Sequence, residues 1–138
     1  MTKGRFIYFF CFFLGILQSV VAQRESFPKG YFQFPIHPGQ KNTLAGVLGD
    51  LRTNHFHAGI DIRTQQREGL QVLAAAEGYI SRIKVQTSGY GNVIFIKHPN
   101  GMTTVYGHLL SVAEPMGSYL RQKQYERTSF EIELNLSP

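Results

Sequence analysis

The chain of 138 residues contains one cysteine, Cys11, and no tryptophan. Cys11 lies in an apolar run near the N-terminus. If that run is removed, the remaining chain has no thiol, which excludes disulfides, cysteine-rich zinc sites and a cysteine nucleophile. The sequence also has no Gly-x-Ser-x-Gly motif and no phosphate-binding glycine loop. A serine hydrolase of that type and a nucleotide site are therefore excluded.

Dense clusters of lysine and arginine are also missing, which argues against a nucleic-acid partner. The formal net charge is +5, from 14 Lys and Arg residues against 9 Asp and Glu residues. Loss of the N-terminal run would remove Lys3 and Arg5 and leave a net charge near +3. This weak positive charge favours an anionic surface such as a bacterial wall.

The N-terminus has the three parts of a secretory signal peptide. A short basic stretch precedes an apolar run over residues 6–17, and small residues then lead to Ala22. We expect residues 1–22 to be cleaved off, with export to the periplasm or cell envelope, or outside the cell, and no membrane contact afterwards. The alternative is an uncleaved membrane anchor, but a spanning helix needs roughly 20 apolar residues and this run is shorter.

Residues 23–50 are rich in proline, glycine and aromatic residues, and prolines this frequent exclude a long helix. We expect this segment to wrap around the domain in an extended conformation and to bury Tyr31, Phe32 and Phe34. The domain itself is assigned to residues 51–138.

Short apolar stretches separated by glycine-containing turns fill the middle of the chain. They predict strands over residues 70–76, 79–85, 93–96 and 102–109, of which 93–96 is expected to be fully buried. A short helix is compatible with residues 118–125, and strict alternation over 130–136 indicates a half-buried strand. The pattern predicts an all-β domain built on an antiparallel β-sheet.

Histidine supplies the candidate chemistry. His57 and Asp61 offer an imidazole nitrogen and a carboxylate oxygen, which both bind zinc at about 2 Å. An extended chain would separate their Cα atoms by roughly 13 Å, so the chain must bend between them, and Gly59 can bend it at little steric cost. Spacing alone nevertheless favours a polar turn with an exposed His57, because a catalytic zinc takes three protein ligands.

His108 ends a strand-like stretch, where it is expected to share one face with Tyr106. His108 has three open roles: general base, metal ligand or hydrogen-bonded core group. When this residue is considered alone, the role of a core group is favoured. His98 precedes a turn and is expected to face solvent. His37 is assigned no role.

Taken together, these stretches resemble one known family. Residues 57–61, His-Ala-Gly-Ile-Asp, resemble the first metal motif of the lysostaphin-like (LytM-type) zinc metallopeptidases. The stretches at 72–80, 89–101 and 104–109, the last with its Tyr-x-His-Leu block, are similar to the following parts of that domain in the same order. The resemblance covers roughly residues 31–125.

The resemblance implies an antiparallel β-sheet domain of the lysostaphin-like peptidase type, with one Zn²⁺ per complete domain. It also implies hydrolysis of peptide bonds in peptidoglycan. His57 and Asp61 would be the zinc ligands, and His108 would be the catalytic histidine beside the zinc-activated water. His55 is an alternative to His57 or a supporting group, but the His-x-x-x-Asp spacing favours His57.

One part of the family pattern has no counterpart in this sequence. The third zinc ligand and another catalytic histidine come from a later His-x-His block, and no histidine follows His108. We therefore expect the domain to be truncated at its C-terminus and the chain alone to be a poor enzyme. The alternative is a non-catalytic peptidoglycan-binding or hydrolase-regulating module. The sequence leaves the oligomeric state open.

Overall fold

The structure, a computed structural model, describes residues 28–37 and 39–138. The signal peptide predicted over residues 1–22 lies outside these ranges. Within them, no helix has the length and apolar character needed to cross a bilayer.

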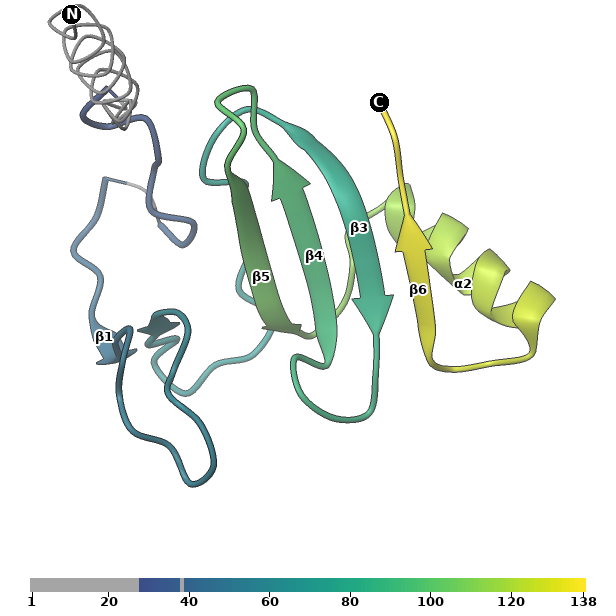
Figure 1. Cartoon of the computed structure of the whole chain (residues 1–138), viewed down its shortest axis with the longest axis horizontal. Coiled ribbons are helices and arrows are strands. Elements are labelled where there is room, and N and C mark those ends of the chain that lie inside the picture. The colour runs from purple at the N-terminus through teal and green to yellow at the C-terminus, as the bar shows by residue number, and fades with distance from the viewer. Residues whose placement is uncertain (1–27, 38) are drawn as a thin grey trace, which may run out of the picture.

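The described residues form two antiparallel sheets and a helix (Figure 1). The smaller sheet pairs β1 (Leu44–Gly46) with β2 (Asp61–Ile62). The larger sheet has the order β5-β4-β3-β6. Its strands are β3 (Tyr79–Val85), β4 (Asn92–Lys97), β5 (Thr103–Leu109) and β6 (Ile132–Asn135), and α2 (Met116–Arg127) lies between β5 and β6 in the chain. The predicted all-β antiparallel fold is confirmed, and so is the predicted helix, with longer bounds.

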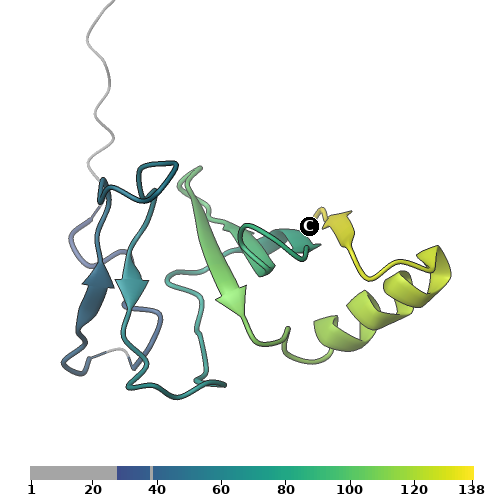
Figure 2. The ribbon, with the colours of Figure 1, turned by 90° about the horizontal axis from the view of Figure 1, so that it is seen from below.

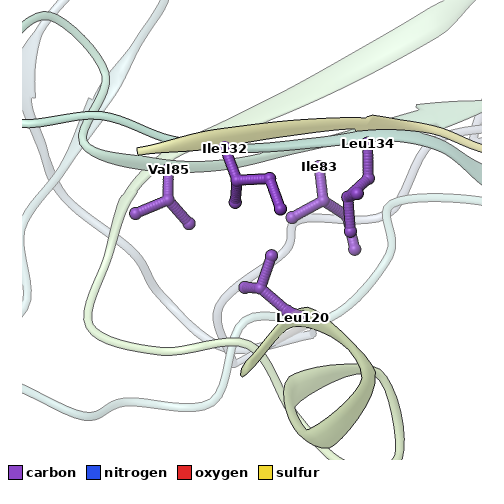
Figure 3. Close-up of a cluster of buried hydrophobic side chains, with 5 residues drawn as sticks. All are labelled: Ile83, Val85, Leu120, Ile132 and Leu134. Carbon is purple, nitrogen blue, oxygen red and sulfur yellow. The ribbon is translucent and has the colours of Figure 1, made fainter. Parts of the chain in front are cut away.

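The apolar core lies between α2 and one face of β3 and β6, the two strands at one edge of the larger sheet (Figures 2 and 3). On β3, Ile83 is fully buried and Val85 nearly so. They pair with Leu134 and Ile132 of β6, and Leu120 of α2 packs against all four. Alternation with a period of two sends these strand residues to one face, so the predicted half-buried C-terminal strand is confirmed.

β4 is a strand as predicted, but the expectation that it is fully buried is wrong. Val93 is buried, whereas Ile94, Phe95 and Ile96 are half-buried. The guanidinium of Arg82 lies 3.7 Å from the centre of the Phe95 ring. The long side chain of Arg82 covers this ring through a cation–π contact while its charged end stays in water. The ring of Phe95 is therefore only partly shielded from solvent.

Residues 70–76 were predicted as a strand, and this prediction is wrong. Two backbone hydrogen bonds join this segment to the N-terminal part of the chain. Gln33 N–H donates to the Ala75 carbonyl at 2.7 Å, and Leu73 N–H donates to the Pro35 carbonyl at 2.8 Å. Because Pro35 has no N–H to return a bond, a regular ladder cannot continue.

His98 was expected to face solvent, but its side chain is buried, with 3% exposure. Its Nδ1 lies 2.7 Å from the Glu77 carbonyl, and its Nε2 lies 2.8 Å from the Thr104 hydroxyl. The Thr104 hydroxyl in turn lies 2.8 Å from the hydroxyl of Tyr106, which accepts the backbone N–H of Ala75 at 2.8 Å. This network ties the segment before β3 to β4 and β5.

The aromatic residues Tyr31, Phe32 and Phe34 of the N-terminal segment are half-buried. Phe32 meets the ring of His98 edge-on, with ring centres 5.2 Å apart. The N-terminal segment therefore contacts the larger sheet at the buried histidine.

Helix α2 begins with a carboxylate cap supplied by the residue before its N-cap. Glu114 accepts the backbone N–H of Ser118 at 2.9 Å and also accepts the guanidinium of Arg121. Its hydrogen bond with Arg121, and then those with Ser118, lower the pKa of Glu114 from 4.5 to about 2.

We therefore expect Glu114→Gln to destabilise the chain at neutral pH. A lowered folded-state pKa means that the stabilising effect is fully present above the unfolded value near 4.5 and is lost as pH falls toward about 2. The difference in urea midpoint between wild type and variant should shrink over that window and vanish below it. Glu68→Gln is the control, and an equal difference at pH 7 and pH 2 would contradict the assignment.

Candidate metal centre

The two candidate ligands lie near the C-terminal end of the segment that joins β1 to β2. Asp61 begins β2 and pairs with Gly46 of β1. Between these two strands, the chain folds into a small hairpin. In it, Gly49 N–H donates to the His57 carbonyl and His57 N–H donates to the Asp50 carbonyl, each at 2.8 Å. These backbone hydrogen bonds hold His57 next to β2 independently of its side-chain contacts.

The side chains of His57 and Asp61 point toward one another. His57 Nε2 lies 3.2 Å from Asp61 Oδ1. A tetrahedral ion with bonds of about 2.0–2.1 Å to nitrogen and oxygen holds its donor atoms about 3.3 Å apart. The separation in this chain therefore fits two ligands of one zinc ion.

The other ring nitrogen of His57 fixes its tautomer. Nδ1 lies 2.9 Å from the backbone carbonyl of Val47, which can only accept, so Nδ1 carries the proton. In the neutral ring, Nε2 then presents a lone pair to a carboxylate oxygen of Asp61, and two acceptors face each other. A cation or a further proton between them resolves this contact, and a backbone carbonyl behind the ring is the usual arrangement for a metal-binding histidine.

The second carboxylate oxygen of Asp61 has a partner that the sequence did not reveal. Arg52 Nη2 donates to Asp61 Oδ2 at 2.6 Å. The separation of nine residues matches no regular spacing, so only the folded hairpin brings these groups together. Each candidate ligand thus makes a hydrogen bond through the atom that does not face the other ligand, Nδ1 of His57 and Oδ2 of Asp61.

The pair is accessible from solvent, with 17% exposure for the side chain of His57 and 41% for that of Asp61. His55, the alternative ligand, is exposed, and its Nδ1 lies 2.7 Å from the side-chain oxygen of Asn54. In the part of the chain that the structure describes, no three His, Cys, Asp or Glu side chains lie close enough to hold one metal ion. The structure therefore brings together two of the predicted residues.

His108 lies apart from this pair, in a β-bulge near the end of β5. Asn92 pairs with Leu109 and Ile94 pairs with Tyr106, so Gly107 and His108 together oppose one residue of β4. The backbone of His108 is left-handed, with φ 55°, and its N–H donates to the Tyr90 carbonyl at 2.8 Å.

The bulge changes how His108 is presented. Alternation with a period of two cannot be carried from Tyr106 across an inserted residue, so the sequence argument for a shared face does not apply. Tyr106 is half-buried and His108 is exposed. Bulges of this kind redirect side chains next to active sites.

Comparisons with known proteins point to one family. Residues 55–125, about half of the chain, match the model described as Peptidase family M23. The DD-carboxypeptidase/endopeptidase Mpg of Neisseria meningitidis is 34% identical over 102 residues, which cover 74% of this chain and 20% of the relative. The cell division protein DipM of Caulobacter vibrioides is 34% identical over 94 residues, covering 68% of this chain and 14% of the relative.

A third relative, an uncharacterized metalloprotease of Haemophilus influenzae, is 30% identical over 94 residues, covering 63% of this chain and 19% of the relative. The chain thus spans about a fifth or less of the length of these relatives. No solved structure matches it. The family model and the relatives confirm the resemblance to the lysostaphin-like peptidases, and the chain belongs to peptidase family M23.

Proposed function

We propose that the chain carries the metal-binding part of a zinc-dependent metalloendopeptidase that cleaves peptide bonds in peptidoglycan. The observation that supports this most directly is the 3.2 Å separation of His57 Nε2 and Asp61 Oδ1, which suits a shared zinc ion. Membership of a peptidase family supports the class of reaction. A relative named as a DD-carboxypeptidase/endopeptidase supports a peptide substrate of the bacterial wall.

Different residues of the chain would have different roles in such a site. Bound zinc would polarise the scissile carbonyl and lower the pKa of a water toward about 7. The Val47 carbonyl holds the proton of His57 on Nδ1 and so keeps Nε2 free to bind the ion. His108, exposed at the bulge, is proposed to transfer a proton or to stabilise the charged tetrahedral intermediate.

We also propose that the protein acts in the cell envelope. The signal peptide predicted over residues 1–22 supports export, and the names of two relatives, a DD-carboxypeptidase/endopeptidase and a cell division protein, fit that location. The weakly basic composition of the remaining chain suits an anionic wall polymer.

The decisive test of the metal pair is His57→Ala, measured as Zn²⁺ affinity by competition with a coloured chelator. We expect the affinity to fall by more than about 100-fold, which exceeds the usual effect of changing a supporting residue. His55→Ala is the matched control and should bind zinc as the wild type does. Zinc binding that depends on His55 instead of His57 would move the ligand assignment to His55.

Cleavage is tested separately, on purified peptidoglycan sacculi with and without a chelator. Peptide release that stops when zinc is removed supports the endopeptidase. Binding to sacculi without cleavage, unchanged by the chelator and by His108→Ala, would instead support a non-catalytic binding or regulatory module.

A further inference from the structure

Arg52 is a charged residue next to the candidate metal pair, and neither the sequence nor the family comparison gives it a role. Its guanidinium donates to Asp61 Oδ2 at 2.6 Å, while the other oxygen, Oδ1, faces His57 Nε2 at 3.2 Å. Its side chain is 39% exposed, and that of Asp61 is 41% exposed. Exposed ion pairs of this kind add little to stability, so the orientation of the carboxylate is the more important consequence.

We propose that Arg52 is a positioning residue that makes Asp61 a one-oxygen ligand of the metal. The two oxygens of a free carboxylate are equivalent, and both can bind one ion. In this chain, the hydrogen bond from Arg52 occupies Oδ2 and leaves Oδ1 to share an ion with His57. This inference rests on the proposed zinc site, because without an ion the pair has no coordination to control.

The hairpin also holds the backbone of Arg52. Arg52 N–H donates to the His55 carbonyl at 2.9 Å, at the tip of the hairpin. The carboxylate of Asp50 lies 4.0 Å from the Arg52 guanidinium and also accepts the backbone N–H of Val47 at 2.8 Å. One small loop thus supplies both supporting contacts, the Val47 carbonyl to His57 and the Arg52 guanidinium to Asp61.

The space for the ion pair depends on a glycine in β1. Gly46 lies opposite Asp61 in the β1–β2 ladder. A Cβ atom added at Gly46 would lie 2.5 Å from both Arg52 Nη2 and Asp61 Oδ2, a distance that real Cβ contacts do not show. Gly46→Ala should therefore separate Arg52 from Asp61 without altering either side chain.

The experiment measures Zn²⁺ affinity and zinc coordination in the full chain. We expect Arg52→Gln and Gly46→Ala to weaken zinc binding by about 10–100-fold, as loss of a supporting hydrogen bond does at other metal sites. Arg52→Lys keeps the charge and should restore part of the affinity. Arg67→Gln is the control, since Arg67 donates its side-chain hydrogen bond to Gln65 Oε1.

Zinc X-ray absorption provides a measurement that a purely structural role would not change. In the wild type, Asp61 should contribute one oxygen at about 2.0–2.2 Å, and in Arg52→Gln it should contribute two. Wild-type affinity and coordination in Arg52→Gln would overturn the inference and leave the proposed function intact. A complete domain that binds zinc but never cleaves peptidoglycan contradicts the function alone, and a wild-type chain that binds no zinc contradicts both.

Discussion

In a complete domain, replacing His108 by alanine should reduce the rate of peptidoglycan cleavage by about 10²–10⁴-fold, the range that a positioned proton-transfer group contributes. The residue is exposed at a bulge and does not join His57 and Asp61 in a three-residue metal cluster within the described ranges. Its loss should therefore leave the Zn²⁺ affinity at the wild-type value. Cleavage is followed as release of soluble peptides from sacculi, and affinity is measured by competition with a chelator.

The combination of the two measurements separates the roles that the sequence left open for His108. A loss of both cleavage and zinc would make it a ligand, and unchanged cleavage would remove it from the mechanism. His37→Ala is the control, because His37 is an exposed histidine outside both candidate elements. Its cleavage rate should equal that of the wild type.

The second large effect is expected at His98, where alanine should lower the free energy of unfolding by about 2–4 kcal/mol. The substitution removes two part-buried hydrogen bonds, so the Glu77 carbonyl loses its His98 partner and the Thr104 hydroxyl keeps only Tyr106. It also removes the ring that packs against Phe32. Urea unfolding followed by circular dichroism measures the change.

His55→Ala is the matched control for this prediction, because its ring is exposed and contacts the neighbouring Asn54 side chain. Its effect should stay within about 0.5 kcal/mol, as for ordinary surface substitutions. If His98→Ala unfolded at the same urea concentration as His55→Ala, the buried network would not stabilise the fold.

Local periodicity predicted the sheet well where one face of a strand is buried. In β3 and β6 the apolar residues alternate, and the alternation matches the face that α2 covers. The apolar composition of residues 70–76 misled the prediction, because composition reports burial and not whether a partner strand can form a ladder. The ladder there is blocked by Pro35, a residue far away in the sequence.

The candidate site was predictable only in part. The resemblance to a known family, more than the His-x-x-x-Asp spacing by itself, pointed to His57 and Asp61, and the structure does bring them together. Nothing in the sequence indicated the roles of Val47 and Arg52. Val47 contributes a backbone carbonyl, which any residue type could supply, and Arg52 reaches Asp61 across a hairpin of irregular spacing. The bulge at His108 was also missed, although Gly107 inside an apolar strand is a sequence sign of a bulge.

The contacts that shape the candidate ligand pair join residues that are close together in the chain. The sequence separation is 4 residues for His57 and Asp61, 9 for Arg52 and Asp61, and 10 for Val47 and His57. In the larger sheet, by contrast, the contact between Arg82 and Glu133 spans 51 residues. Short loops lose less entropy on closure than long ones, and local contacts form faster during folding. The ligand pair is thus a structure of low contact order, whose geometry is reached without closing the long loop that joins β3 to β6.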